Sequence, residues 1–220
     1  MPSHEDAGET KIFIRRDKLK VKVEVNYVSR GTVRPIHRGS LSRRAKDAIQ
    51  ADLELPIVSI EDLYGGKLVA AMDRQHPRDL FDVMELLRNE GITPGIRRCF
   101  VVYLASHHRP IHEVLFPPLR DISGDFEGSF KGMTSELVHL GDLLSTRDQM
   151  IAELHAGLDA AEKGFLVSLS RNVPDWDSLE IPHLAKLPAI RWKAENIAKL
   201  AEANPRKLAE QASRLEKAFK

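Results

Sequence analysis

Apolar and polar residues alternate along residues 20–28, a pattern that predicts a β-strand. Val21, Val23 and Val25 alternate with polar residues, among them Glu24. One face of this strand is therefore expected to belong to the core and the other to be polar. Residues 11–16 have a similar strand-forming composition, and a short charged segment separates them from the second strand. The pattern predicts a β-hairpin.

Two helices are expected between residues 59 and 91. Ser59 can cap the first helix, and Pro77 prevents that helix from continuing far past Gln75. Pro77 also suits the first turn of a second helix, which is expected to run towards Gly91. A connection this short predicts that the two helices form an antiparallel hairpin.

The pattern changes beyond residue 120. Glycines and serines are frequent in residues 121–133, which predicts a linker. Helices are then expected at residues 146–171, with Ser145 and Asp148 as a capping box, and at residues 189–203 and 205–219. Trp192 is expected as a core anchor in preference to a base-stacking platform. Residues 134–220 thus predict an all-helical bundle domain.

The predicted helical hairpin brings a lysine level with a carboxylate. Lys67 lies about 10 Å back from the connection and Asp82 a similar distance forward, at about 1.5 Å of rise per residue. Asp79 lies one turn nearer the connection and about 60° around the helix from Asp82, so both acids can share a face. The equal distances favour Asp82 over Asp79 as the partner of Lys67.

These charges allow two interpretations. The ordinary one is a salt bridge between helices, with Asp79 stabilised by the dipole of the helix it begins. Gly65 and Gly66 weaken that interpretation, because each glycine inside a helix costs about 1 kcal/mol relative to alanine. Two glycines are reasonable here if something must come close to the backbone beside Lys67. The sequence therefore also predicts a binding site.

Three segments together resemble the nucleotidyltransferases of the AbiEii/AbiGii toxin family. They are residues 58–87, the sequence Lys-Val-Glu-Val-Asn-Tyr at residues 22–27, and the sequence Leu-Pro-Ala-Ile-Arg-Trp-Lys at residues 187–193. The resemblance implies a polymerase-β-like core that transfers a nucleotide from a nucleoside triphosphate with a divalent metal, Mg²⁺. It also implies a toxin of a toxin-antitoxin, abortive-infection or phage-defence system, with a cognate antitoxin as partner and transfer RNA as an acceptor.

The resemblance also implies roles for individual residues. Lys67 matches the family's functional lysine, with Gly66 beside the bound nucleotide, and the block that contains Asp79 and Asp82 matches its last acidic motif. These acids would orient the lysine, assist a proton transfer or complete a metal shell. Glu24 is a candidate third carboxylate on the predicted strand, and a solvated edge residue is the equally open alternative.

One family motif is missing from the sequence. Members carry a Gly-Ser or Gly-Gly turn and an Asp-x-Asp before the strand that residues 20–28 match, and residues 1–16 contain neither. Two carboxylates on one strand face would hold the metal ions of such an enzyme, so no residue here is assigned as a metal ligand. We therefore expect the chain to correspond to the later two-thirds of such an enzyme and to be inactive by itself.

A concentration of positive charge follows the predicted hairpin. Arg30, Arg34, Arg38, Arg43 and Arg44 lie in a segment with few acids, and they are candidates for contact with an RNA backbone. No aromatic residue is interleaved for base stacking, so an ordinary solvated surface is the other interpretation.

Composition narrows the class of protein. The 220 residues are 42% hydrophobic and 30% charged, with a net charge of +1, which is ordinary for a soluble chain and gives no global preference for nucleic acid. The single cysteine, Cys99, excludes an internal disulfide, suits a cytoplasmic protein and is expected to be a buried thiol. No apolar segment approaches the roughly 18 residues that span a bilayer, so no membrane partner is expected.

The sequence as a whole predicts an α+β fold. An incomplete nucleotidyltransferase sheet with helices is expected in residues 1–120, and the all-helical domain follows the linker. The alternative to a nucleotidyltransferase toxin is a non-catalytic module that binds RNA or an antitoxin.

Overall fold

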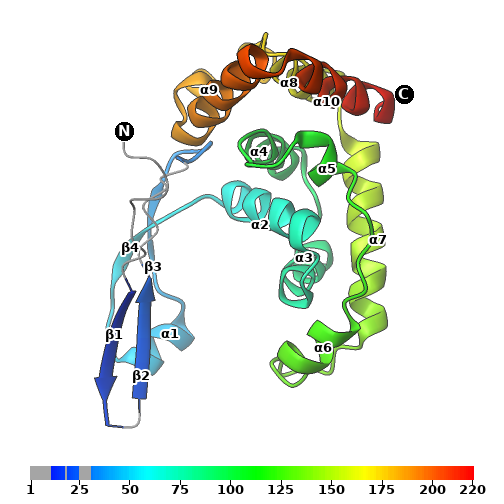
Figure 1. Ribbon diagram of the computed structural model, residues 1–220. Coiled ribbons are helices and arrows are strands. Elements are labelled where there is room, and N and C mark those ends of the chain that lie inside the picture. The colour runs from blue at the N-terminus through cyan, green and yellow to red at the C-terminus, as the bar shows by residue number, and fades with distance from the viewer. Residues whose placement is uncertain (1–10, 18, 25–30) are drawn as a thin grey trace.

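The computed structural model describes residues 11–17, 19–24 and 31–220, and it is an α+β structure in which helices predominate (Figure 1). The described elements, in chain order, are β1 (Lys11–Arg16), β2 (Leu19–Glu24), β3 (His37–Ser40), α1 (Arg43–Ile49), β4 (Glu54–Ile57), α2 (Ile60–Arg74), α3 (Pro77–Asn89), α4 (Pro94–Ala105), α5 (Ile111–Leu115), α6 (Ser123–Ser129), α7 (Leu140–Gly157), α8 (Ala160–Ser170), the 3-10 helix η1 (Leu184–Lys186), α9 (Pro188–Ala203) and α10 (Pro205–Ala218).

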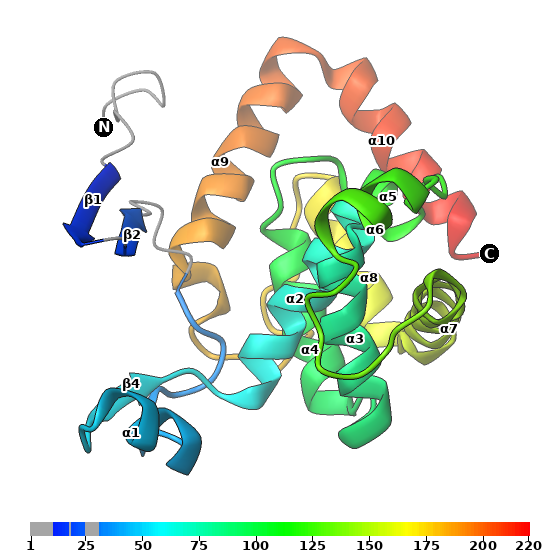
Figure 2. The same cartoon turned by 90° about the horizontal axis from the view of Figure 1, so that it is seen from below.

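Strands β1 and β2 form the expected antiparallel hairpin, with Ile12 opposite Val23 and Ile14 opposite Val21. The expectation that the valine face of β2 belongs to the core is wrong. Val21 is 56% exposed and Val23 is 38% exposed, and the hairpin stands away from α2 and α3 (Figures 1 and 2). Alternation predicts which residues share a face, but a face is buried only if another element covers it. Val25 lies outside the described residues.

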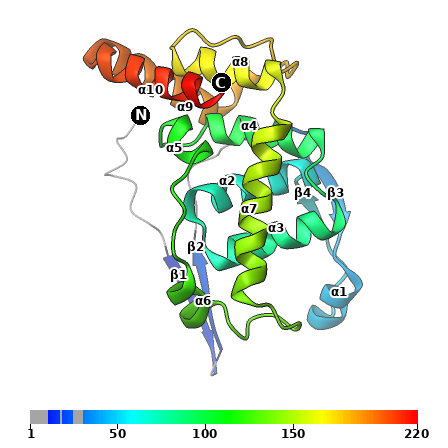
Figure 3. The same cartoon turned by 90° about the vertical axis from the view of Figure 1, so that its right-hand side faces the viewer.

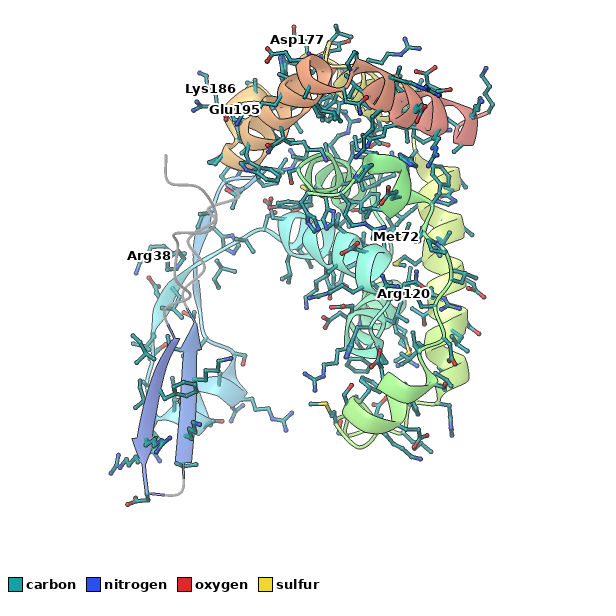
Figure 4. The ribbon with its side chains drawn as sticks, in the orientation of Figure 1. Arg38, Met72, Arg120, Asp177, Lys186 and Glu195 are labelled. Atoms are coloured by element: carbon teal, nitrogen blue, oxygen red, sulfur yellow. The ribbon has the colours of Figure 1, made fainter. Side chains whose placement is uncertain are left out.

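A second antiparallel pair, β3 and β4, flanks α1 in the sequence, and residues 34–57 form an exposed arm that is separate from the β1 and β2 hairpin (Figure 3). Helix α1 has no buried residue. Arg38 lies on this arm, away from the helical body, in Figure 4. The described sheet therefore consists of two separate pairs of strands, outside the helical core.

Helix α2 is central to the helical body, where it crosses α4 closely (Figure 3). The crossing occurs at Gly65, where an added Cβ would lie 2.8 Å from both the Cβ of Cys99 and the backbone nitrogen of Phe100. Both of these residues are fully buried. Only a residue without a side chain allows the two helix backbones to approach this far.

Asp62 joins the arm to the helical body. Its carboxylate is buried and accepts hydrogen bonds from the backbone N–H groups of Val33 and Arg34, at 2.7 and 2.9 Å. The hydroxyls of Tyr103 and Ser59 also donate to it, at 2.6 and 3.1 Å. A buried carboxylate needs such donors to offset its lost hydration, so this contact fixes where the arm leaves the body.

The connection between α2 and α3 is short because Gln75 adopts a left-handed conformation, with a φ of 52°. Its side chain is buried, donates to the carbonyl of Pro118 at 2.8 Å and accepts from the N–H of Arg120 at 3.0 Å. Arg120 lies next to the end of α2 in Figure 4, where Met72 is also labelled. These two bonds hold a backbone conformation that is unfavourable for a residue other than glycine.

The expectation of a single helix at residues 146–171 is wrong, because the chain forms two helices, α7 and α8, in this region. Helix α7 begins earlier, where the carboxylate of Asp142 accepts from the N–H of His139 at 2.9 Å. Helix α8 begins with a reciprocal capping box, in which Asp159 and Glu162 each accept from the other's N–H, at 2.8 and 3.0 Å. The sequence signal for this break was the Asp-x-x-Glu spacing.

The last two helices, α9 and α10, are confirmed close to their expected bounds. One hydrophobic core cluster extends from Val33 through α2, α3 and α4 to Leu215 of α10. Helix α6 lies within the segment expected as a linker. The division at residues 121–133 stays a prediction, and the core is continuous across it.

The two glycines of α2 give a matched test of the helix crossing. Replacing Gly65 by alanine is expected to lower the free energy of unfolding by about 1–3 kcal/mol, because the new methyl group overlaps backbone atoms of α4. Gly66→Ala meets nothing within 4 Å and is expected to raise it by about 0.5–1 kcal/mol. Urea unfolding of both variants measures the difference. Equal effects at the two positions would contradict the close crossing.

Candidate functional site

Lys67 and Asp82 face each other across the helical hairpin, as the sequence predicts. The Nζ atom of Lys67 donates to Oδ2 of Asp82 at 2.5 Å. The two side chains are 35% and 39% exposed, so the pair lies at the surface of the hairpin with one side open to solvent. An ion pair this exposed contributes only about 0–1 kcal/mol to stability.

Asp79 has a different partner. Nε and Nη2 of Arg74 donate to its two carboxylate oxygens at 3.0 and 2.6 Å, a bidentate arrangement that closes the end of the hairpin. The geometry thus associates Lys67 with Asp82 alone, which agrees with the preference drawn from the equal distances. Asp79 is a structural partner of the connection between α2 and α3.

Negative charge surrounds the pair. Tyr64 lies one turn before Lys67 on α2, and burial raises the pKa of its phenol. The charges of Glu90, Asp82 and Glu85 raise this pKa further. Tyr64 therefore stays protonated at neutral pH and presents a neutral hydroxyl beside the lysine. Arg88 of α3 pairs with Glu85 at 3.2 Å, so this edge of α3 carries charges of both signs, and Lys67 pairs with its Asp82.

Gly65 and Gly66 have separate explanations. Gly65 is required by the crossing with α4, so it gives no indication of a ligand. Gly66 has nothing within 4 Å of the position of an added Cβ, which leaves the helix backbone beside Lys67 open. The close approach expected at these glycines is made by α4 at Gly65, and Gly66 alone keeps the interpretation that a ligand approaches.

The residues of the hairpin do not fit a divalent metal. Asp82 and Asp79 already pair with Lys67 and Arg74, and each pairing neutralises the charge that a metal ion would need. Within the described ranges, no group of three His, Cys, Asp or Glu side chains is placed to hold a metal ion. Lys67 and Asp82 can therefore act as supporting groups for phosphate chemistry, but they do not form a metal centre.

The candidate RNA-contacting arginines lie along the arm. Arg34, Arg38, Arg43 and Arg44 are exposed, and Arg38 pairs with the side chain and carbonyl of Glu54. Arg43 and Arg44 begin α1 and project from a helix without buried residues. Arg30 and the side chain of Glu24 lie outside the described residues, so their proposed roles stay predictions.

Two further residues have definite environments. Cys99 is the buried thiol that the sequence predicts, and burial, with the nearby charge of Asp62, raises its pKa to about 12. It therefore stays protonated and unreactive. Lys193 was missed, although the signal was present: it occupies a core position of α9, in a stripe with Ile190 and Ile197.

Comparisons with known proteins place the chain in a family. No helix in the described part of the chain is long and apolar enough to cross a membrane. Searches of curated proteins and of solved structures give no match. The family model described as "Nucleotidyl transferase AbiEii toxin, Type IV TA system" matches residues 3–196. Such a family implies a nucleotide substrate, an antitoxin partner and, in general, the use of a divalent metal. The chain belongs to the AbiEii nucleotidyl transferase toxin family.

Proposed function

We propose that Lys67 contacts the triphosphate of a nucleoside triphosphate and that Asp82 positions this lysine. The observation that supports this role is the pair itself, held at 2.5 Å beside the open backbone of Gly66. An ammonium group has three protons, and Asp82 accepts one, so the others remain for phosphate oxygens. Lysine is well suited to this task as a compact positive charge on a flexible stem.

The acceptor in this proposal is transfer RNA, and the enzyme belongs to a toxin-antitoxin system with a role in phage defence. The reaction that this site would support is expected to take place in the cytoplasm. We further propose that this chain by itself transfers no nucleotide, because phosphoryl transfer needs the attacking and leaving oxygens clamped by metal-bound carboxylates. The support is that Asp79 and Asp82 are both neutralised by basic partners.

Lys67→Met is expected to weaken the binding of ATP and GTP about tenfold or more, since a hydrogen bond to a charged group contributes about 1.5–3 kcal/mol. Asp82→Asn is expected to change affinity less than about threefold. This variant loses the orientation of Lys67, which weakens binding, but it also removes a negative charge near the triphosphate, which strengthens binding. The two effects oppose each other, so the net change should stay well below 1.4 kcal/mol, the free energy that corresponds to about tenfold in affinity. Isothermal titration calorimetry without added metal measures both.

The matched control is Lys131→Met, since Lys131 is also an exposed lysine paired with a carboxylate, at 2.8 Å from Glu127. This variant is expected to bind nucleotides like the parent protein. Unchanged binding by Lys67→Met would remove the residue on which the proposal depends. An equal loss of affinity in Lys131→Met would show that the effect of Lys67→Met comes from the change in net charge and not from a contact with the triphosphate.

The proposed inactivity has a direct test. The 220-residue protein is incubated with Mg²⁺, total transfer RNA and each labelled nucleoside triphosphate in turn, and RNA and protein are separated on gels. No labelled product is expected, because the hairpin supplies no metal-binding carboxylates. A transfer-RNA nucleotidyltransferase of known activity, run in parallel, shows that the RNA accepts label. Robust labelling by the 220-residue protein would overturn the proposal.

The second candidate function is a non-catalytic module that binds RNA or the antitoxin. The observation in its favour is the exposed arm, where Arg43 and Arg44 project from α1 without a described acidic partner. Phosphate contacts of this kind give affinity without sequence specificity. This function does not require Lys67.

The Arg43→Ala, Arg44→Ala double variant is expected to bind transfer RNA more weakly than the parent. The slope of log affinity against log salt should become shallower by about 2, because each lost phosphate contact removes about 1. Fluorescence anisotropy with labelled RNA measures both quantities. The control is Arg191→Ala, Arg206→Ala, two exposed arginines of the C-terminal helices. Identical slopes for all three proteins would exclude the arm as the RNA-binding surface.

A further inference from the structure

A pocket of about 390 Å³ lies between the connection that follows α4, helix α5, and the two C-terminal helices α9 and α10. These elements lie together on the side of the molecule that carries the C-terminus (Figure 3). No lining residue belongs to α2 or α3, which carry Lys67 and Asp82. The pocket is therefore a separate feature from the nucleotide site proposed above.

The walls of the pocket are apolar and its charges are of one sign. Ile111, Ile197, Leu208 and Leu215 line it, and Trp192, a residue that is 40% exposed, contributes its indole ring. The expectation that Trp192 is a buried core anchor is therefore wrong. Lys193 and Lys207 also line the pocket, and no aspartate or glutamate does. This combination suits a ligand with an apolar body and a negative charge.

Lys193 is buried in the pocket wall with unused hydrogen-bonding capacity. Its Nζ atom donates to the carbonyls of His107 and Arg109, both at 2.7 Å, which accounts for two of its three protons. Burial lowers its pKa to about 8, and the nearby charge of Glu113 partly opposes this effect. The two carbonyls stabilise the ammonium without neutralising its charge, so an anion would be a favourable third partner.

His112 adds a second buried polar atom to the same wall. Its Nε2 atom is buried and has no hydrogen-bond partner within the described part of the chain. Burial lowers the pKa of His112, and the nearby charge of Arg214 lowers it further while Glu113 opposes both. The ring is therefore neutral at physiological pH. Buried polar groups are normally hydrogen-bonded, so an unpartnered one beside a pocket calls for an external partner.

We propose that this pocket binds a small organic anion, such as an aromatic carboxylate, with its charged group on Lys193 and its ring against Trp192. The apolar residues of α9 and α10 would bury the ring. The charged group would take the third proton of Lys193, and a polar atom of the ligand would reach Nε2 of His112. The chemistry that selects the ligand is the positive charge of Lys193, with Lys207 also in the wall, in an apolar pocket whose described lining contains no acidic residue.

The test uses two probes of the same shape, 1-naphthoate, which is charged, and 1-naphthamide, which is neutral. At pH 7 we expect 1-naphthoate to bind at least tenfold more tightly than 1-naphthamide, measured by isothermal titration calorimetry on the full chain. Lys193→Met is expected to lower the affinity for 1-naphthoate at least tenfold. Lys199→Met is the matched control, since Lys199 is exposed on the same helix outside the pocket, and it should bind like the parent.

A second variant keeps the test decisive if Lys193→Met fails to fold. Gln211→Trp fills the pocket from α10 and leaves Lys193 and its two carbonyl partners in place, so it should also abolish binding. In the parent, affinity for 1-naphthoate should fall as the pH rises from 7.5 to 9.5, because Lys193 loses its proton through about pH 8. His112 is already neutral in this range, and His108 and Lys207 are the other titratable groups in the wall.

Three outcomes would overturn the inference. The first is no binding of 1-naphthoate, which would mean that water alone satisfies Lys193 and His112. The second is equal affinity for the charged and neutral probes, which would place the probe on an apolar surface without Lys193. The third is full binding by Gln211→Trp, which would locate the probe elsewhere, for example on the exposed residues of the β1 and β2 hairpin.

Discussion

The close crossing of α2 and α4 at Gly65 is the constraint on which the rest of the structure depends. It places the opposite faces of α2 in different environments. One face carries Asp62 into contact with Tyr103 of α4 and holds the arm through the N–H groups of residues 33 and 34. The other carries Lys67 to the surface, level with Asp82 of α3. A side chain at residue 65 would push the two helix backbones apart, and it would therefore displace both Asp62 and Lys67 from their present partners.

The hairpin places a pair of opposite charges at its surface. Lys67 and Asp82 hold each other at the solvent boundary, and Asp79 is committed to Arg74. Such a pair can neutralise and orient a triphosphate, but it cannot polarise two oxygens at once as bridged metal ions do. The family assignment and the geometry are therefore consistent if Lys67 and Asp82 support a reaction whose metal-binding groups are not in this hairpin.

The C-terminal helices contribute more than packing. Burying a lysine is costly unless its protons are satisfied, and α9 buries Lys193 against two backbone carbonyls of the connection after α4. A hydrophobic residue would pack there without this cost. The buried charge links α9 to the rest of the core, and it also leaves one polar position facing a pocket with apolar walls.

The sequence by itself determined the α2 and α3 hairpin and the pairing of Lys67 with Asp82. Helix caps, prolines and the 3.6-residue period are local signals, and a short connection fixes which residues come level. The tertiary structure alone decided what each residue packs against. It explained Gly65 by the helix crossing, left Val21 and Val23 exposed, and buried Lys193 while exposing Trp192. These outcomes depend on neighbours distant in sequence, which periodicity cannot identify, because a pattern predicts a face and only the fold covers it.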